Sequence, residues 1–434
     1  MKAAFHTLGC KVNSYETQAI LEQFTGLGFE IVPFNQAADV YVINTCSVTQ
    51  VAEQKSRQML HRAKRLNPEA VVIATGCYAQ EEGEKLLSDE SIDLVIGNNL
   101  KSRIAELAQE ALESRAEQAE VEDLTHCRDY EEQKISNQGK NVRAYVKIQD
   151  GCDRFCSYCI IPYVRGRSRS REISDVLDEV RTLVQNGYKE LVITGIDISS
   201  YDKGFGELLR EIDRIQGVER IRLGSLEAGI INESLIETLR SIDKFCPHFH
   251  LSLQSGCDAT LKRMNRKYTA DEFYQTMEYI RANFDDPGIT TDIIVGFAGE
   301  TEEEFEESLA FARKAAFSQA HIFPYSRRKG TAADKMPGQL SKKEKAERVD
   351  RMMEITDRTH LEFLESRIGK PQKILVEENI EIDGESYVSG FTPEYVKVVA
   401  KAPENMINQI ISVIPEQIIT LAGGEKSLKA VLDT

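Results

Sequence analysis

The chain has no tryptophan and no long run of apolar residues. A membrane-spanning helix needs roughly 20 predominantly apolar residues in succession, and no stretch of this sequence provides them. Residues 1–6 lead directly into a strand-like segment and lack the hydrophobic centre of a signal peptide. We therefore expect a cytoplasmic protein that makes no use of the membrane.

The chain also has fewer basic than acidic residues. Lysine and arginine together number 54 against 70 aspartates and glutamates, which gives a net charge of −16. Phosphate contacts depend on lysine and arginine, so a net negative charge is unfavourable for a nucleic-acid partner. Any nucleic-acid partner must be held by a local cluster of basic side chains.

The nine cysteines form an odd number in a chain with no export signal. Disulfide frameworks belong to oxidising compartments and use cysteines in pairs. The cysteines are therefore expected to be reduced thiols, and some of them are candidates for metal binding or reaction.

At 434 residues the chain is too long for one ordinary core and is expected to hold several domains. Residues 1–112 alternate short apolar runs with amphipathic stretches, which is typical of a doubly wound parallel α/β domain. The expected helices are Ser14–Leu27 and Val51–Leu66. The expected strands are Ala3–Leu8, Val40–Asn44 and Val71–Thr75.

Residues 113–142 are polar and charged, and we interpret them as a linker with room for one strand. The βα alternation returns over residues 143–368 and predicts a full or partial parallel barrel. Residues 369–434 contain short β-rich runs and predict a small β-barrel. The expected strands are Ala144–Ile148, Glu190–Thr194, Arg220–Leu223, His248–Leu253, Thr290–Val295, Ala320–Phe323, Gln372–Glu377, Tyr387–Phe391, Val396–Lys401 and Gln409–Ile414.

Cys152, Cys156 and Cys159 form a C-x₃-C-x₂-C run directly after a predicted strand. Three thiolates this close together can bind three irons of one 4Fe–4S cluster and leave the fourth iron open to a small molecule. A structural zinc site normally uses two separated pairs of ligands, and a redox pair does not need a third cysteine. The run therefore predicts an iron–sulfur cluster.

A second group, Cys10, Cys46 and Cys77, follows the three predicted strands of residues 1–112. The carboxyl ends of parallel strands lie side by side, and ligands bind there. The pattern predicts a second cluster, although each cysteine taken singly fits an ordinary buried residue equally well. Cys127, Cys246 and Cys257 show no such pattern and are expected to be packed or free.

The C-x₃-C-x₂-C run, with Tyr158 before its last cysteine, resembles the signature of the radical S-adenosylmethionine (SAM) superfamily. The whole chain resembles the methylthiotransferases within it. That family has a cysteine-bearing N-terminal domain, a radical SAM barrel and a C-terminal TRAM β-barrel. The resemblance implies two 4Fe–4S clusters, with SAM as both methyl donor and radical source, and insertion of a methylthio group at an unactivated carbon.

Residues 6–13, 159–171, 250–256 and 262–267 resemble the branch that acts on N6-threonylcarbamoyladenosine in tRNA. This implies modification at C2 of that base, at position 37 beside the anticodon. It also implies an electron donor of flavodoxin or ferredoxin type and a sulfur source. Sister branches act on isopentenyladenosine in tRNA or on a ribosomal protein side chain, and both remain alternatives. A non-catalytic iron–sulfur electron carrier is a third, although it needs neither an open iron nor a barrel.

By position, the resemblance implies six SAM contacts. Carboxylates and amides suit ribose hydroxyls and the cofactor's amino group, and arginine suits its carboxylate. Each could equally be an ordinary polar residue at a strand end. The candidates are Thr194, Gly195, Asp197, Glu227, Gln254 and Arg266. Two departures, Ala228 and Ala298, stand where the family pattern leads us to expect proline.

Three basic runs follow predicted strands and are expected to bind tRNA phosphates, although charge runs are often only solvated surface. The runs are Arg165, Arg167, Arg169 and Arg171; Lys262, Arg263, Arg266 and Lys267; and Arg327, Arg328 and Lys329. Residues 370–434 hold 6 lysines and no arginine against 10 acidic residues. This balance does not favour phosphate binding by the tail.

Overall fold

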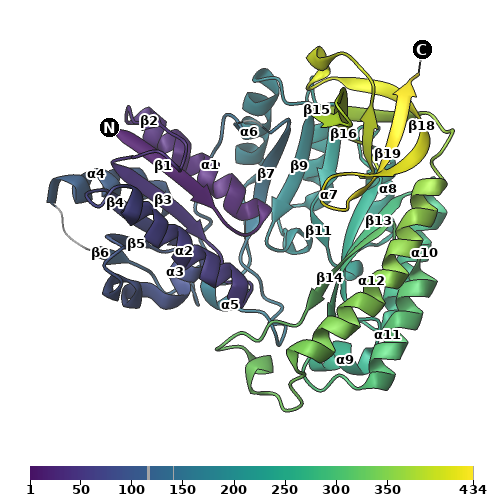
Figure 1. Ribbon diagram of the computed structural model, residues 1–434, viewed down its shortest axis with the longest axis horizontal. Coiled ribbons are helices and arrows are strands. Elements are labelled where there is room, and N and C mark those ends of the chain that lie inside the picture. The colour runs from purple at the N-terminus through teal and green to yellow at the C-terminus, as the bar shows by residue number, and fades with distance from the viewer. Residues whose placement is uncertain (115–117, 140, 434) are drawn as a thin grey trace.

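The computed structural model describes residues 1–114, 118–139 and 141–433, and it arranges three sheet systems along the chain (Figure 1). The first is a six-stranded parallel sheet in the order β2-β1-β3-β4-β5-β6. Its strands are β1 (Lys2–Thr7), β2 (Glu30–Ile31), β3 (Val40–Thr45), β4 (Val71–Gly76), β5 (Leu94–Ile96) and β6 (Gln118–Glu120). The strands and helices expected in residues 1–112 are confirmed. β2 and β5 are further strands that were not predicted, and β6 adds an edge strand from the segment interpreted as a linker.

Every residue of β3 and β4 is buried, as in a parallel sheet covered on both faces. Helices α1 (Lys11–Gly26) and α4 (Ile104–Ser114) cover one face through residues such as Phe24 and Leu107. Helix α2 (Gln50–Leu66) covers the other face with Leu60. The short α3 (Cys77–Glu82) begins where β4 ends.

The central region contains two successive four-stranded sheets, in the orders β10-β9-β7-β8 and β11-β12-β13-β14. Apart from the β7–β8 pair their strands run parallel, which agrees with the expected partial barrel. The strands are β7 (Arg143–Asp150), β8 (Arg169–Ser170), β9 (Glu190–Gly195), β10 (Arg220–Leu223), β11 (Ser225–Leu226), β12 (His248–Gln254), β13 (Gly288–Val295) and β14 (Gln319–Pro324).

Helices pack around these two sheets, and α6, α7, α8, α10, α11 and α12 share one hydrophobic core with the strands. Capping boxes at Thr269, Thr301 and Ser341 satisfy the first backbone N–H groups of α10, α11 and α12. The helices are α5 (Ile161–Val164), α6 (Ile173–Gln185), α7 (Phe205–Asp213), α8 (Glu233–Arg240), α9 (Asp258–Arg263), α10 (Ala270–Asn283), α11 (Glu302–Ala315) and α12 (Lys342–Glu365). Short 3₁₀ turns are η1 (Gly83–Ser88), η2 (Lys101–Arg103), η3 (Ile198–Ser200), η4 (Ala228–Ile230), η5 (Ala332–Lys335) and η6 (Glu404–Met406).

The C-terminal segment closes into a five-stranded barrel in the order β15-β16-β17-β19-β18, which confirms the expected small β-barrel. Its strands are β15 (Gln372–Ile382), β16 (Glu385–Phe391), β17 (Lys397–Ala400), β18 (Ile410–Thr420) and β19 (Lys426–Leu432). Arg222 of β10 donates to the carbonyl oxygens of Thr392 (3.0 Å) and Pro393 (2.8 Å), so this barrel is docked on the central sheet. Within the described residues, no helix combines the length and apolar character needed to cross a bilayer.

Candidate functional site

Cys10, Cys46 and Cys77 lie at one edge of the first sheet. β1, β3 and β4 are neighbours in it, and each cysteine comes within three residues of the end of one of these strands. A Cβ atom added to Gly9 would lie 3.0 Å from the Sγ atom of Cys46, so the chain segments approach closely there. Burial raises the pKa of Cys46 to about 11, and the neighbouring thiols of Cys77 and Cys10 add to the rise. The three thiols are therefore close enough to interact electrostatically.

Gly76 makes this arrangement possible between β4 and α3. Its φ of +91° is a conformation that side-chain-bearing residues rarely adopt, and an added Cβ atom would lie 2.4 Å from the carbonyl oxygen of Thr45. Because glycine has no side chain, the chain can turn here while its backbone packs directly against the neighbouring strand β3. Cys77 follows immediately and is placed at the sheet edge as the first residue of α3.

The second group of cysteines occupies the loop that follows β7. Backbone bonds fold this loop, with the Cys152 N–H donating to the Gly166 oxygen and the Cys159 N–H to the Cys156 oxygen, both at 3.0 Å. Burial raises the pKa values of Cys152 and Cys159 to about 12, and the Cys156 thiol contributes to both shifts. These thiols would lose protons on binding metal, as cysteine ligands do.

All six cysteines are free thiols, and their chemistry fits iron–sulfur ligation. Within residues 1–114, 118–139 and 141–433, no three cysteine, histidine or acidic side chains lie close enough to share a single metal ion. A 4Fe–4S cluster attaches each cysteine to a different iron, so its thiolates stand further apart than the ligands of one zinc ion. Cys246 and Cys257 are buried and Cys127 is half-buried.

A cavity of about 570 Å³ lies beside the Cys156 loop, a size that suits a small cofactor. Arg266 lines it and donates to four groups, namely the Glu227 carboxylate (2.5 Å), the Cys156 sulfur (3.3 Å), the Ser252 carbonyl oxygen (3.0 Å) and the Tyr268 hydroxyl (2.9 Å). The Tyr268 ring packs against the same guanidinium, with its centre 4.9 Å from the Arg266 Cζ atom. The cavity therefore presents a fixed cation and a carboxylate next to a cysteine sulfur.

Of the six SAM-contact candidates, Glu227 and Arg266 line this cavity. Asp197 is buried and accepts a hydrogen bond from Arg154 at 2.7 Å. Thr194, Gly195 and Gln254 lie at the ends of β9 and β12, outside the cavity lining. The structure thus brings two of the six together at the cavity.

Sequence reasoning missed Arg154 and Tyr268, which both line the cavity. Arg154 lies 3.7 Å from the Glu227 carboxylate and also binds Asp197, so it joins two of the expected contacts. Its position between Cys152 and Cys156 could have identified it from the sequence, because any side chain inside that loop must lie near these candidate ligands.

The structure corrects part of the basic-run expectation. Arg165, Arg169 and Arg171 are all buried, and Arg171 pairs with Glu132 and Glu179. Arg328 is also buried and binds Glu53 and Glu81 of the N-terminal region. A buried guanidinium engaged with protein carboxylates does not face a phosphate. These four arginines hold the protein together and are wrong as candidates for tRNA contact.

The remaining basic residues stay accessible to different degrees. Arg263 is partly buried and bound to Glu304, and the Arg266 side chain is almost fully buried beside the cavity. Arg167 is about one-third exposed in its side chain. The exposed members of the runs are Lys262, Lys267, Arg327 and Lys329.

The two cysteine groups lie on elements that pack against each other. Helix α3 begins at Cys77, and α5 begins two residues after Cys159. The Cys77 side chain belongs to one small core cluster with Ile160 and Val164. Two candidate cluster sites, one from each half of the molecule, therefore share a packed boundary.

Comparison with known proteins agrees with this division. The Radical SAM superfamily matches residues 146–312, and a family described as "Uncharacterized protein family UPF0004" matches residues 2–97. A radical SAM methyltransferase structure, TsrM from Kitasatospora setae, covers 75% of this chain and 75% of its own at 15% identity, with a TM-score of 0.56. At that identity the likeness shows the fold alone.

Curated relatives are similar over nearly the whole chain. A threonylcarbamoyladenosine tRNA methylthiotransferase MtaB from Bacillus subtilis is 42% identical over 94% of this chain and 92% of its own. The Aquifex aeolicus protein of that name is 40% identical over 89% and 96%. A tRNA-2-methylthio-N(6)-dimethylallyladenosine synthase from Acetivibrio thermocellus is 35% identical over 94% and 87%. These similarities extend from the N-terminal cysteine-bearing region to the C-terminal barrel and confirm the expected family. The chain belongs to the radical SAM methylthiotransferases.

Proposed function

We propose that this enzyme adds a methylthio group to C2 of N6-threonylcarbamoyladenosine, at position 37 beside the anticodon of tRNA. The observation that carries the proposal is the packing of Cys77, from the first cysteine group, against residues that directly follow Cys159 of the second. An enzyme that joins sulfur to a carbon radical needs its sulfur source and its radical source at one substrate. Relatives named for this substrate, at 42% and 40% identity, support the choice of base.

Cys152, Cys156 and Cys159 would hold one 4Fe–4S cluster, and the fourth iron would be open to SAM. Cys10, Cys46 and Cys77 would hold the second. When bound, these groups supply a radical source and a sulfur atom that accepts a methyl group, with SAM serving as both methyl donor and radical precursor. We also propose the domain division 1–112, 113–142, 143–368 and 369–434, which gives each cluster its own domain.

The chain's own residues bind and orient the cofactor. Arg266 would pair with the SAM carboxylate, because a guanidinium offers two parallel donors to such a group. Glu227 would accept from the amino group or from ribose hydroxyls, and Tyr268 holds the Arg266 guanidinium in place from one side. Asp197, Thr194, Gly195 and Gln254 remain candidates for further contacts from the strand ends.

Exposed cations around the site would hold the tRNA backbone. Lys262 and Lys267 flank the turn that carries Arg266, while Arg327 and Lys329 lie in the loop after β14. Arg167, beside the cluster loop, is a fifth candidate. The reaction also needs an electron donor, for which we propose a flavodoxin or ferredoxin, and a source of replacement sulfur.

The test is nucleoside analysis by mass spectrometry after incubation with reconstituted enzyme, SAM and a reductant. Two control substrates should remain unmodified, namely tRNA that lacks the threonylcarbamoyl group and purified ribosomal protein. The proposal expects 2-methylthio-N6-threonylcarbamoyladenosine as the product. A methylthio group found instead on isopentenyladenosine would favour the second candidate, which the Acetivibrio thermocellus relative supports. A methylthiolated protein would overturn the tRNA assignment.

A further inference from the structure

We propose that Arg165 is a positioning residue that brings the surplus positive charge of a buried ion network to the Cys77 sulfur, and so raises the reduction potential of the cluster held there. This inference rests on the second cluster of the proposed function. It gives a role to an arginine that sequence reasoning had placed on the tRNA-binding surface.

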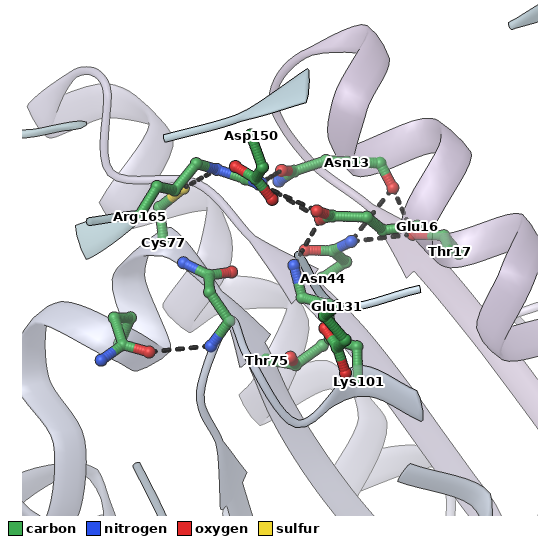
Figure 2. Close-up of polar contacts among 12 residues, drawn as sticks. Asn13, Glu16, Thr17, Asn44, Thr75, Cys77, Lys101, Glu131, Asp150 and Arg165 are labelled. Atoms are coloured by element: carbon green, nitrogen blue, oxygen red, sulfur yellow. Dashed lines mark hydrogen bonds and ion pairs between the residues drawn. The ribbon is translucent and has the colours of Figure 1, made fainter. Parts of the chain in front are cut away.

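Every nitrogen of the Arg165 guanidinium has a partner (Figure 2). Nε donates to the Cys77 sulfur at 3.3 Å. Nη1 donates to Glu16 at 2.8 Å and to Asp150 at 3.1 Å. Nη2 donates to Asn13 at 2.7 Å and to Glu16 at 3.1 Å. With 0% of its surface exposed, Arg165 exchanges none of these contacts for water.

The network around Arg165 spans both halves of the molecule. Glu16 on α1 also accepts from Lys101 of η2 and, at 2.8 Å, from Lys147 of β7. Lys147 donates in turn to Asp150 at 2.6 Å. All five ionised side chains belong to residues that are at most 5% exposed. The network is therefore shielded from water, and its charges interact more strongly than they would at the protein surface.

The charges of this network do not balance. Lys101, Lys147 and Arg165 supply three positive charges, whereas Glu16 and Asp150 supply two negative ones. At the edge, an Arg169 nitrogen lies 4.0 Å from Asp150, and Glu131 faces Lys101 and Lys147. The charges of Arg169 and Glu131 are opposite in sign, so together they leave the network with one surplus positive charge.

A buried cation without a counter-charge is costly, so an anion is expected where the network ends. Of the side chains that Arg165 contacts in the described chain, Asn13 is neutral and the two carboxylates are already counted. Cys77 is the remaining one. A cluster bound through thiolates places negative charge at that sulfur and would complete the balance.

Asn13 extends the reach of Arg165 to the other two cysteines. Its side-chain nitrogen donates to the Leu8 oxygen at 2.7 Å and to the Thr45 oxygen at 3.1 Å. Leu8 stands two residues before Cys10, and Thr45 directly precedes Cys46. Since these bonds fix the amide orientation, the Asn13 oxygen faces Arg165. One guanidinium thus contacts Cys77 directly and supports the backbone before both partner cysteines.

A donor and a positive charge beside a ligand sulfur favour the reduced cluster, because reduction adds negative charge. Loss of Arg165 should therefore make the potential more negative. Loss of Glu16 removes a counter-charge and should shift it the opposite way. A role limited to packing would give no such pair of opposite shifts.

The experiment is an anaerobic redox titration followed by electron paramagnetic resonance, in full-length protein carrying Cys152→Ala, Cys156→Ala and Cys159→Ala. On this background Arg165→Met should lower the midpoint potential by about 59 mV or more, the value of a tenfold change for one electron. Glu16→Gln should raise it. Arg103→Gln, an exposed arginine of the same domain, should leave it unchanged.

If the Arg165→Met variant does not bind iron, Lys101→Met is the alternative variant. It removes one positive charge from the network but leaves the Arg165–Cys77 contact in place, so it should also lower the midpoint potential. If the variants bind an intact cluster but its midpoint potential is unchanged, this inference is overturned, whereas the proposed function is not affected. A background protein that binds no iron would overturn the second cluster as well. If the midpoint potentials shift as expected but no modified tRNA is formed, the inference stands and the proposed tRNA substrate is contradicted.

Discussion

Arg266 donates from Nη1 to the Sγ atom of Cys156 at 3.3 Å, and its Nη2 contacts Glu227 at 2.5 Å. The guanidinium therefore joins the cysteine loop to the Glu227 carboxylate, and all three line the same cavity. The same kind of contact occurs at the other cysteine group, where Arg165 donates to Cys77. Each candidate cluster site thus has one buried arginine that donates to the sulfur of a candidate ligand cysteine.

Replacing Arg266 with lysine should weaken SAM binding about tenfold or more. A lysine cannot reproduce the paired donors of a guanidinium, and hydrogen bonds to charged groups are worth about 1.5–3 kcal/mol each. Anaerobic equilibrium dialysis with labelled SAM measures the change, and iron content should stay at the wild-type level. Arg240→Lys, on the outside of α8, serves as the control. Unchanged SAM affinity in the Arg266 variant would contradict the cavity assignment.

Replacing Cys46 with alanine should separate the two halves of the reaction. The variant should still cleave SAM when reduced, because the Cys152–Cys159 loop is untouched. It should not transfer sulfur, because the second cluster loses a ligand. Chromatography of the SAM cleavage products and mass spectrometry of tRNA nucleosides report the two activities. Methylthio product from this variant would rule out the second cluster.

Charge reversal at Lys262 and Lys267 should weaken tRNA binding and leave tRNA-independent SAM cleavage unchanged. Each lost phosphate contact should reduce the salt dependence of log K by roughly 0.7–0.9. Filter binding over a range of salt concentrations measures the slope. Lys343→Glu, on the exposed start of α12, reverses a charge remote from the site and should have little effect.

Replacing Gly76 with alanine should disturb the second cluster more than a matched glycine change elsewhere. Gly28 also has a positive φ, at +81°, but a Cβ atom added there would meet no atom of the described chain within 4 Å, whereas one added to Gly76 would meet the Thr45 oxygen at 2.4 Å. Gly28→Ala should cost only the conformational strain of about 1–2 kcal/mol. Gly76→Ala should add a steric clash and lower iron content. Melting temperature and iron analysis compare the two, and equal behaviour would contradict the role given to Gly76.

The docking of the C-terminal barrel should weaken in mild acid. Burial, assisted by the Arg222 charge, holds the pKa of His248 well below its usual 6.5, and its ring stacks on Tyr395 at 4.7 Å. The unfolded chain binds a proton below pH 6.5 that the folded chain excludes. Stability from the neutral ring is therefore complete above pH 6.5 and falls, by up to about 1.4 kcal/mol per pH unit, towards the folded pKa.

Hydrogen exchange of β12 and of the C-terminal barrel between pH 7 and pH 5 measures this loss. His248→Gln removes the titrating group and should flatten the pH dependence, even if it lowers stability at pH 7. The exposed His126→Gln should keep the wild-type profile. A wild-type profile that is already flat would contradict the assignment to His248.

Local sequence patterns predicted the strands and the positions of the cysteines well. Cys46 directly follows a fully buried strand, and the end of such a strand is visible in the sequence itself. The last strand, β19, was missed, because its pairing with β17 and β18 depends on barrel closure and not on a local pattern. The βα alternation predicted the first two sheet systems, and the short β-rich runs predicted the C-terminal barrel.

The buried network could not be predicted, because its members are far apart in the sequence. Glu16 and Arg165 are separated by 149 residues, and Glu16 and Lys101 by 85. In the sequence, Arg165 belongs to a basic run that has the composition of a solvated surface. The packing of α1 against β7 and of α3 against α5 encloses that arginine, and tertiary contacts of this kind leave no periodic signal.

Iron content with Mössbauer spectroscopy, for anaerobically reconstituted wild type and for the Cys152/Cys156/Cys159→Ala variant, tests the two-cluster account most directly. Two independent 4Fe–4S sites predict about eight irons in the wild type and about four in the variant. About four irons in the wild type and none in the variant would contradict the account, because Cys10, Cys46 and Cys77 would then hold no cluster.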